Sequence, residues 1–461
     1  MKEDMIERGQ LKSIEKIFGR KAVVILGPRQ VGKSTLLHQM LDGEDNVMWL
    51  NGDDQDVREL FENFSAAKMR TILGKNTTLA LDEAQRIPGI GLKLKIVTDQ
   101  MKDVKIITTG SSSLDLAAGL NESLSGRKRE FILLPLTFKE LTDHHGLLEE
   151  KRLLHRRMIY GYYPEVVTTP GEERDILREI VDSYLYKDIL NLDLVAKPEK
   201  LSKLVQALAY QIGSQVSYNE IAQLIGLDSK TVERYVDILE KCFVIFRVNS
   251  FSRNLRNELK SSKKIFFWDC GIRNAIINNF APVEKRSPIE NGALWENWII
   301  SERLKYNNLT GERTTPWFWR TKQQSEIDYI EDKDGIISTF EFKWNPKAKA
   351  SLPPLFATSY PDATFKVITP QNCENFICLE ETPSILKITD AKYIKDYILC
   401  LTFNTGEERL CDFLPLAKKG ICQKLQNMEY FRNFRLDPFT VDWNNEIGFA
   451  PEYLLQHSTK I

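Results

Sequence analysis

The first third of the chain shows short, largely apolar runs separated by longer polar stretches. The runs cover residues 22–26, 77–81, 104–107 and 131–134. A continuous apolar run of this length, bounded by turn residues, is typical of a strand buried on both faces. The pattern therefore predicts buried strands that alternate with helices, which is an α/β domain.

The middle of the chain has helical rather than strand periodicity. Ser217 and Glu220 have the S-x-x-E spacing of a capping box, and the helix they open is predicted to end at Gly226. A second helix is predicted over 229–241, followed by a β-rich stretch at 242–248. The positions predicted to face the core are Ile221, Leu224, Ile225, Val232, Tyr235, Val236, Ile238 and Leu239. This order predicts a winged helix-turn-helix, and it fits a helical protein-interaction module equally well.

Residues 326–330 and 338–344 alternate between polar and apolar side chains, as half-buried strands do. The link at 332–335 is short and ends in glycine, which predicts a hairpin. Leu294, Trp298 and Ile299 indicate a helix before it. After a linker at 380–384, alternating strands restart, and a small α+β tail domain is predicted.

Composition adds limits to this picture. The chain has 461 residues, enough for about three domains at roughly 150 residues each. Its 63 basic residues balance 64 acidic ones, so nucleic-acid binding would need a local basic surface. Seven cysteines without a C-x-x-C pair fit neither a disulfide framework nor a zinc ribbon. The charged N-terminus and strand-sized apolar runs predict a cytoplasmic protein with no membrane segment.

One stretch offers such a local basic surface. Residues 251–264 contain Arg253, Arg256, Lys260, Lys263 and Lys264 against a single acid. A phosphate backbone would bind there with salt-dependent affinity, although a solvated surface without a ligand has the same composition.

The first apolar run leads directly into a G-x-x-x-x-G-K-S loop. The amide groups of such a loop cradle phosphate, while Lys33 neutralises charge on the β- and γ-phosphates and Ser34 ligates Mg²⁺. The sequence thus predicts an ATP site with Mg²⁺. Its cofactor-binding residues are Gly27, Pro28, Arg29, Gln30, Val31, Gly32, Lys33, Ser34 and Thr35.

The second run ends in two carboxylates, which is the form of a Walker B strand. Asp82 is predicted to hold Mg²⁺, and Glu83 to orient or deprotonate the attacking water. The third run leads into hydroxyl side chains, among them Thr109 and Ser111. These could contact the γ-phosphate or simply cap the next helix.

The hairpin at 326–344 carries a second set of candidate catalytic groups. Asp328 lies on the first strand, and Glu341 and Lys343 share a face of the second. An aspartate on one strand, followed by Glu-x-Lys on the next, forms the D…(D/E)-x-K pattern of restriction-endonuclease-like domains. Asp328, Glu341 and the helix-borne Glu296 are the predicted metal ligands, and Lys343 would position water. A polar face retained on an inactive domain explains the same residues.

The segments GPRQVGKST, TTLALDEAQ, IITTGSSS and LSGRKREFILLPLTFKEL together resemble prokaryotic AAA-like ATPases with a large uncharacterised C-terminal domain. The resemblance implies a parallel sheet with helices on both faces. It also implies a sensor role for the hydroxyls at 109–111 and an arginine finger at Arg127 that acts on a neighbouring subunit.

The same resemblance extends through the rest of the chain. Residues 161–164 resemble the family's lid segment and 184–190 the opening of its C-terminal domain. SRNLRNELKSSKKIFFWDCGIRNA, GALWENWIISER and FWRTKQQSEIDYIED match its later part. The last 75 or so residues resemble a small bacterial domain of unknown function.

We therefore expect four domains: 1–170, a P-loop AAA-like ATPase with a lid; 171–285, a winged helix; 286–380, a nuclease-like α/β domain; and 385–461, a small tail. The expected function is ATP hydrolysis that controls a nucleic-acid-acting half, on DNA rather than RNA, with self-association. The alternative is a switch ATPase whose nuclease-like half is an inactive binding platform.

Overall fold

The computed structural model describes residues 5–111, 124–183, 189, 195, 197–251, 262–321, 323, 325–378, 387–404, 407–418, 420–436, 440–444 and 446–460, except the side chains of residues 452 and 460. The chain divides into two compact units, Met1–Cys378 and Leu379–Ile461. The second unit, the tail, begins near the predicted boundary at 385. Within the first unit we call residues 5–145 the N-terminal part and residues 147–378 the second half.

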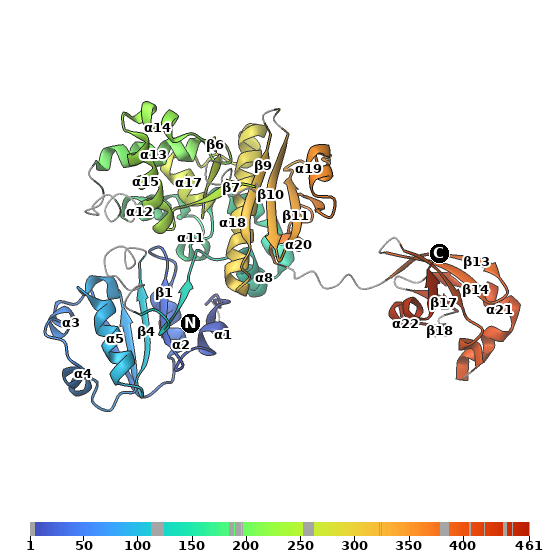
Figure 1. The fold of residues 1–461 in the computed structure, drawn as a ribbon, viewed down its shortest axis with the longest axis horizontal. Helices are drawn as coiled ribbons and strands as arrows, with labels where there is room; N and C mark the ends of the chain where they lie inside the picture. Colours follow the sequence, from blue (N-terminus) through green and yellow to red (C-terminus); the bar gives the residue numbers. More distant parts are fainter. Residues whose placement is uncertain are drawn as a thin grey trace. The chain divides into compact units, whose positions relative to one another are not determined.

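The N-terminal part is built on a parallel sheet with strand order β2-β3-β4-β1-β5. All four apolar runs lie within or directly beside its strands, which confirms the predicted α/β fold (Figure 1). Its elements are α1 (Leu11–Glu15), β1 (Ala22–Leu26), α2 (Lys33–Met40), β2 (Val47–Asn51), α3 (Gln55–Leu60), α4 (Ala66–Leu73), β3 (Thr78–Asp82), η1 (Ala84–Arg86), α5 (Ile90–Gln100), β4 (Lys105–Gly110), β5 (Lys128–Ile132) and α8 (Phe138–His145).

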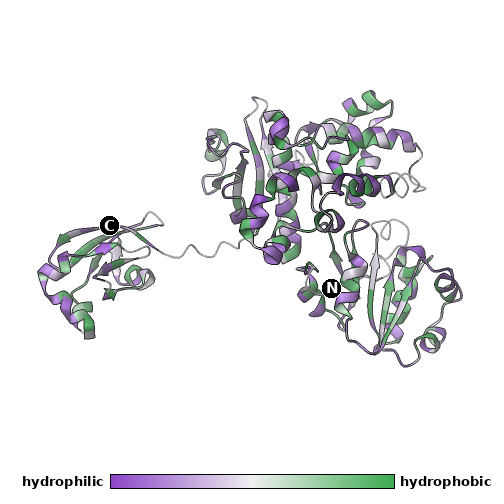
Figure 2. Ribbon diagram, turned by 180° about the vertical axis from the view of Figure 1, so that it is seen from behind, coloured by the Kyte–Doolittle hydropathy of each residue, from purple (hydrophilic) through white to green (hydrophobic). Residues whose placement is uncertain are grey.

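Strand β1 is buried along both faces because its side chains alternate between two apolar cores. Val23 and Ile25 pack in the core that includes Leu36 and Leu37 of α2. Val24 and Leu26 pack in a second core with side chains of α3, α4 and α5. Figure 2 shows the apolar strands between helices whose outer faces are hydrophilic. Helices therefore cover both faces, as the resemblance implies.

The second half is organised around one mixed sheet with strand order β12-β11-β10-β9-β7-β8-β6. Its elements are α9 (Leu147–Arg152), α10 (Leu154–Tyr160), α11 (Pro164–Thr168), α12 (Glu173–Ile180), α13 (Pro198–Tyr210), β6 (Gln215–Val216), α14 (Tyr218–Ile225), α15 (Ser229–Lys241), β7 (Ile245–Ser250), β8 (Lys263–Phe267), α17 (Cys270–Ile276), η3 (Val283–Lys285), α18 (Pro288–Thr310), β9 (Thr315–Arg320), β10 (Glu326–Lys333), β11 (Ile336–Phe342), α19 (Pro354–Ser359), β12 (Thr364–Ile368) and α20 (Glu374–Ile377).

This sheet crosses the predicted boundary between residues 285 and 286. Strand β7 pairs with β8 on one side and, in parallel, with β9 on the other, through Asn249↔Trp317 and Ser250↔Phe318. The strands that would form the wing therefore continue into the strands of the nuclease-like region as one sheet.

The two predicted middle helices are confirmed as α14 and α15. The Ser217 hydroxyl accepts the Glu220 N–H at 3.4 Å, and Gly226 ends the helix in the left-handed conformation. The predicted core stripe of α15 is buried throughout. Leu224 is the exception in α14, because it is 69% exposed and so was wrongly predicted to lie in the core.

The tail has its own sheets, with strand orders β13-β14-β15-β19 and β16-β17-β18. Trp443, Phe413 and Phe431 lie at the centre of its core. Its elements are β13 (Ile388–Lys395), β14 (Ile398–Phe403), β15 (Glu408–Asp412), η4 (Leu416–Lys418), η5 (Gly420–Gln426), α21 (Met428–Arg432), β16 (Arg435–Leu436), β17 (Val441–Trp443), β18 (Ile447–Gly448), α22 (Pro451–Gln456) and β19 (Ser458–Lys460). An expected strand start at Ile385 and a turn at Thr405-Gly406 lie outside the described residues.

The described residues bear on two expectations, one about membrane segments and one about the cysteines. No described helix combines the length and apolarity needed to cross a membrane. The cysteines, all of which are described, are free thiols.

Candidate functional site

The loop between β1 and α2 has the geometry of a phosphate cradle. Gln30 and Gly32 have φ values of 61° and 87°, and the loop curls at these positions. A side chain at Gly27 would place Cβ 2.0 Å from the Leu133 carbonyl oxygen, so only glycine fits there. Helix α2 begins at Lys33 without a side-chain cap, which leaves its first N–H groups directed at the loop.

The Lys33 side chain is folded back onto this loop. Its ammonium donates hydrogen bonds to the carbonyl oxygens of Gly27 at 3.1 Å and Pro28 at 2.8 Å. Burial lowers the pKa of Lys33 to about 8, against the opposing effect of Glu83 and Asp82. Phosphate oxygens would supply the counter-charge that the two carbonyls provide only in part, so the loop fits a nucleoside triphosphate.

Three predicted residues meet at the carboxyl ends of β3 and β4. The Thr109 hydroxyl donates to Asp82 Oδ1, and the Glu83 N–H lies 3.1 Å from the same oxygen and 3.2 Å from Thr109 Oγ1. The Glu83 carboxylate accepts a hydrogen bond from Gln85 Nε2, a partner that the sequence did not reveal. A carboxylate and the Ser34 hydroxyl are ligands suited to Mg²⁺, so the residues present fit Mg²⁺ as well as ATP.

Ser111 follows β4 and is 5% exposed. Ser112, the residue after it, and the helix that these hydroxyls could cap lie outside the described residues. Both interpretations of these hydroxyls therefore remain predictions, although the Thr109 contact with Asp82 favours the role at the phosphates.

Arg127 lies at the opposite edge of the sheet. It precedes β5, and its carbonyl accepts the N–H of Ala22 at the start of β1, whereas the phosphate loop follows the end of β1. Its side chain pairs with Asp99 at 2.6 Å and is 42% exposed. Arg127 is thus not part of its own chain's nucleotide site, and a role at a neighbouring subunit remains a prediction.

The predicted lid segment, residues 161–164, contacts both the start of α17 and the segment after β5. The Tyr162 N–H donates to Asp269 Oδ2 at 2.7 Å, while its carbonyl accepts the Leu136 N–H at 2.9 Å. Gly161 has a φ of 72°, and a Cβ there would lie 2.0 Å from Asp269 Oδ1. Asp269 also caps α17 by accepting the Ile272 N–H at 3.1 Å.

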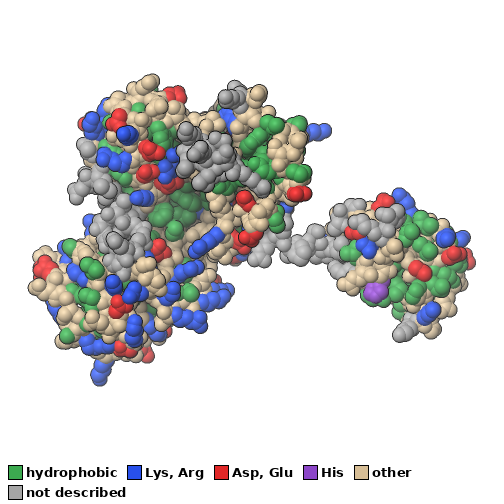
Figure 3. Space-filling view, viewed as in Figure 1, with side chains coloured by type: hydrophobic (Ala, Val, Ile, Leu, Met, Phe, Trp, Pro, Cys, Tyr) green, Lys and Arg blue, Asp and Glu red, His purple; other side chains and the backbone are tan. Residues whose placement is uncertain are grey.

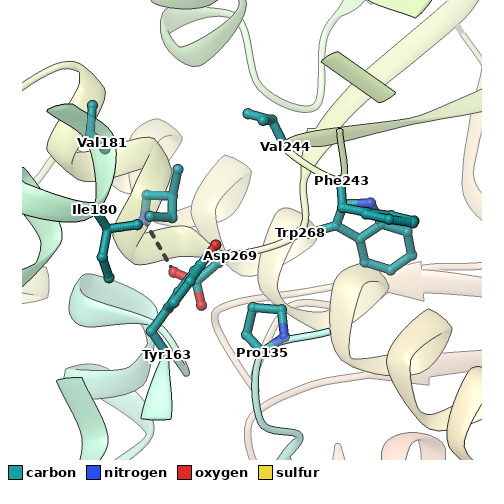
Figure 4. Close-up of a pocket in the computed structure, with 9 residues that line it drawn as sticks. Pro135, Tyr163, Ile180, Val181, Phe243, Val244, Trp268 and Asp269 are labelled. Carbon is teal, nitrogen blue, oxygen red and sulfur yellow. Dashed lines mark hydrogen bonds between the residues drawn. The ribbon is translucent and has the colours of Figure 1, made fainter. Parts of the chain in front are cut away.

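Asp269 is fully buried, and burial raises its pKa. Figure 4 shows Pro135, Tyr163 and Trp268 around it, in a small apolar pocket. Because two backbone N–H groups already bind its carboxylate, the arrangement explains Asp269 as an anchor for the 161–162 turn.

A chain of buried polar contacts joins the phosphate loop to helix α18. Arg8 donates to the carbonyl oxygens of Val31 in the loop and Leu134 after β5, both at 2.7 Å, and pairs with Glu140 at 2.9 Å. From α18, Lys305 donates to the Leu136 carbonyl at 2.8 Å, and Glu302 accepts the Phe138 N–H at 2.7 Å. Sequence patterns did not reveal these contacts.

Helix α18 also carries Glu296, one of the predicted metal ligands. Glu296, Glu326, Asp328 and Glu341 form what we call the acidic cluster. Glu326 and Asp328 lie on β10, and Glu341 lies on β11. The two strands pair antiparallel and are joined by a two-residue turn at Asp334 and Gly335, with positive φ at both positions. The predicted hairpin and its shared polar face are therefore present.

Lysines accompany the acidic cluster. Lys343 Nζ lies 2.6 Å from Glu341 Oε1. Lys264 Nζ lies 2.8 Å from Glu296 Oε1 and 2.6 Å from Glu326 Oε1. Lys264 was predicted to contribute to a basic surface, but it is 2% exposed. The prediction was wrong because neighbouring residues of a strand face opposite sides, and Lys264 faces the interior.

The pKa values of groups in the acidic cluster differ from those of exposed side chains. Burial, with Glu296 and Glu341 nearby, raises the pKa of Asp328 to about 8. Burial also raises the pKa of Glu296, against the effect of Lys264. The carboxylates raise the pKa of Lys264 above its ordinary value despite the opposing effect of its burial.

A magnesium site does not fit this arrangement. Among the described residues, no three histidine, cysteine, aspartate or glutamate side chains are grouped so that they could hold one metal ion. The oxygens of Glu296 and Glu341 that a metal would bind instead face Lys264 and Lys343.

Basic side chains gather elsewhere, near α1 (Figure 3). Lys16, Arg20, Lys21 and Arg129 are exposed. Lys21 leads into β1, and Arg129 lies on the adjacent strand β5. Of the predicted basic segment, residues 252–261 lie outside the described residues.

Four family models match successive parts of the chain. Residues 19–142 match the AAA domain family, which confirms an AAA-like ATPase domain. Residues 151–283 match a domain of unknown function (DUF8612), 291–376 another (DUF4143), and 388–460 a protein family of unknown function (DUF2442).

Curated relatives extend across much of the chain. An uncharacterized protein of Mycobacterium tuberculosis is 26% identical over 350 residues, which are 74% of each chain. An uncharacterized protein of Methanocaldococcus jannaschii is 24% identical over 359 residues, 72% of this chain and 78% of the relative.

Solved structures give weaker likenesses. Domain III of the Thermotoga maritima replication initiation protein DnaA has a TM-score of 0.25 and 16% identity, and covers 52% of this chain and 95% of its own. Bacteroides Pif1 bound to ssDNA has a TM-score of 0.22 and 15% identity, and covers 38% of this chain and 50% of its own. Scores of this size add nothing to the functional assignment.

Proposed function

We propose that this chain, which carries an AAA domain over residues 19–142, binds and hydrolyses ATP and passes its nucleotide state to the second half. The observation that carries the proposal is the meeting of Asp82, Glu83 and Thr109 beside a curled phosphate loop. A loop alone explains binding, whereas the adjacent carboxylates also explain turnover.

Each residue has a separate task in this proposal. The loop amides and Lys33 bind the β- and γ-phosphates, while Ser34 and Asp82 hold Mg²⁺. Held there, Mg²⁺ would neutralise charge that develops during phosphoryl transfer. Glu83 orients the attacking water or accepts its proton, and Gln85 and Thr109 fix the position of the Glu83 segment. The contacts of Lys33, Asp82 and Glu83 support these roles.

The path from nucleotide to the second half runs through Arg8 and α18. A change at the phosphate loop alters the Val31 carbonyl that Arg8 binds, and Arg8 also holds Leu134. The segment that follows Leu134 is bound by Glu302 and Lys305. A rigid helix then extends the contact to Glu296. These hydrogen bonds, linked by the backbone of residues 134–138, support coupling between the two parts.

Two substitutions test the ATPase. Lys33→Ala should abolish ATP binding, measured by calorimetry, because the buried ammonium is lost. Glu83→Gln should retain binding and lose phosphate release. The matched controls are Lys102→Ala and Glu62→Gln, which alter exposed groups and should behave as wild type. Unchanged affinity in Lys33→Ala would refute the binding site, and undiminished turnover in Glu83→Gln would remove Glu83 from the mechanism.

We propose further that the chain, whose second half has the predicted winged-helix and nuclease-like regions, binds nucleic acid, with DNA favoured over RNA. The exposed basic residues near α1, which belong to the N-terminal part, support a surface for the phosphate backbone. Of the two expected roles, a binding platform agrees better with the acidic cluster than cleavage does, because its carboxylates already pair with lysines.

Fluorescence anisotropy with labelled duplex DNA tests this second proposal. Charge reversal of Lys16, Arg20, Lys21 and Arg129 should weaken binding at least about tenfold and reduce its salt dependence, since these residues would contact phosphates. ATP turnover without DNA should not change. Charge reversal of Lys230 and Arg234, which are exposed on α15, tests the winged helix as an alternative surface. Full affinity in both variants would contradict the proposal.

A further inference from the structure

Lys264 occupies the interior of the acidic cluster. It lies on β8 next to Lys263, whose side chain faces the other way and pairs with Glu233 at 3.6 Å. Lys264 itself is 2% exposed and lies between Glu296 of α18 and Glu326 of β10. Two elements that carry candidate metal ligands are thus joined by one ammonium group.

The remaining carboxylates of the acidic cluster also have partners from within the chain. Glu341 pairs with Lys343 at 2.6 Å, and Asp328 Oδ2 accepts the Phe342 N–H at 2.8 Å. Glu326 has a second cation in Arg320, at 3.6 Å. Buried carboxylates need such compensation, because an unpaired charge in a poorly solvated site is strongly unfavourable. The acidic cluster obtains it without a metal ion.

A divalent cation would have to displace this arrangement. Mg²⁺ requires oxygen ligands in octahedral geometry, and carboxylates that bind it must turn toward a common point. Glu296 turns toward Lys264 instead, and Lys264 is only 2% exposed. An added cation beside a buried ammonium would meet direct electrostatic repulsion.

We propose that Lys264 is a resident counter-ion that takes the place of a divalent metal ion and closes the acidic cluster to metal. The second half accordingly holds its nuclease-like strands together without metal-dependent cleavage. This inference rests on the proposed nuclease-like character of the second half, but it does not depend on nucleotide binding.

Mn²⁺ binding to the full-length chain tests the inference, with bound and free ion distinguished by electron paramagnetic resonance in the absence of nucleotide. The wild type and Asp328→Asn should bind Mn²⁺ equally, because the acidic cluster takes up none. Lys264→Met combined with Glu326→Gln removes one positive and one negative charge and keeps Glu296, Asp328 and Glu341. This variant should gain one site per chain, at least about tenfold tighter than any wild-type binding.

Controls separate Lys264 from general effects of charge. Lys263→Met removes the neighbouring cation on the other face of β8 and should gain no site. Adding Asp328→Asn to the Lys264→Met/Glu326→Gln chain should abolish the gained site. Circular dichroism reports whether each variant is folded, and ATP binding in the same samples reports separately on the nucleotide site.

Two results would overturn the inference. One is Mn²⁺ binding by the wild type that Asp328→Asn removes, since the acidic cluster would then be open. The other is a folded Lys264→Met/Glu326→Gln chain that gains no site, since Lys264 would then not be what excludes the ion. If the double variant does not fold, the comparison of wild type with Asp328→Asn decides alone. Loss of ATP binding without a change in Mn²⁺ behaviour would count only against the nucleotide site.

Discussion

Lys33 is bound by carbonyl oxygens of its own loop, and its pKa of about 8 lies far below that of an exposed lysine. Above pH 8 the free protein therefore loses the Lys33 proton, whereas bound phosphates favour the charged form. ATP binding should take up a proton above pH 8, and affinity should fall by up to about tenfold for each further pH unit.

Calorimetry in two buffers with different ionisation enthalpies measures this proton uptake. Lys33→Arg provides the comparison, because its guanidinium stays charged throughout and should show no uptake. Binding without proton uptake at pH 9 in the wild type would mean that the Lys33 pKa is not lowered.

Arg127 lies too far from the phosphate loop of its own chain to contact a nucleotide there, and its predicted role is at a neighbouring subunit. It lies at the amino edge of the sheet, while the phosphate loop lies one length of β1 away, about 16 Å at roughly 3.3 Å per residue. Arg127→Ala should therefore retain ATP binding and lose turnover. Mixing it with Lys33→Ala chains should restore part of that turnover, because each chain supplies what the other lacks.

Phosphate release at several mixing ratios provides the measurement. Arg129→Ala, which alters a neighbouring exposed cation, should behave as wild type without mixing. Turnover that stays flat across all ratios would contradict action between subunits.

Local motifs made several residues predictable. Lys33, Asp82 and Glu83 lie at the ends of apolar runs, so their position follows from neighbours in the sequence. Arg8 and Lys264 could not be found in this way. Their partners lie 23 to 132 residues away in the first case and 32 or more in the second, and only the folded chain brings them together.

At the scale of elements, a helix could be predicted where capping residues mark its ends and where only one of its faces is buried. Helix α15 has both, with an Asp228 cap and a single apolar face, and its predicted bounds are confirmed. Helix α18 has buried residues around most of its middle, among them Trp295, Trp298 and Ile300. Its sequence therefore shows no single apolar face. The pairing of β7 with β9 left no local signal at all.

The turn before α11 depends on a single glycine. Gly161→Ala should destabilise the chain by about 3 kcal/mol or more, because Cβ would overlap the buried Asp269 carboxylate in addition to the strain of a positive φ. Gly171 provides the control, because it has a φ of 106° and an added Cβ would have nothing within 4 Å. Gly171→Ala should therefore lower the stability only by the backbone strain, about 1 to 2 kcal/mol.

Chemical unfolding of the two alanine variants measures the difference. Equal destabilisation would show that the 161–162 turn adjusts without disturbing Asp269.

The contact between α8 and α18 should make stability depend on pH. Burial raises the pKa of Glu302 to about 7 from an ordinary 4.5, so the folded chain holds this proton more tightly than the unfolded chain. The resulting stabilisation is complete below pH 4.5 and is lost as pH rises through 7. Glu302→Gln should lose less stability than the wild type between pH 5 and 7.5.

Melting temperatures across this range provide the measurement. Glu165→Gln, which changes an exposed carboxylate, should follow the wild type. Parallel curves for wild type and Glu302→Gln would show that Glu302 does not titrate in this range.

At the scale of the whole molecule, the tail has an apolar core of its own around Trp443. Removal of residues 379–461 should leave the ATP affinity and the melting temperature of the remaining chain within experimental error. Calorimetric unfolding of the intact chain should show one additional transition, which Trp443→Ala shifts down by several degrees. A large loss of ATP affinity on truncation would show that the tail supports the nucleotide site.

The parallel pairing of β7 with β9 has a consequence for synthesis of the chain. During translation, β7 and β8 leave the ribosome well before residues 315–320 do, and until then one edge of β7 has no neighbour. An unpaired, apolar strand edge is a template for association with other nascent chains. Expression of a fragment that stops at residue 285 should therefore yield insoluble protein, whereas a fragment that continues to 378 closes this edge.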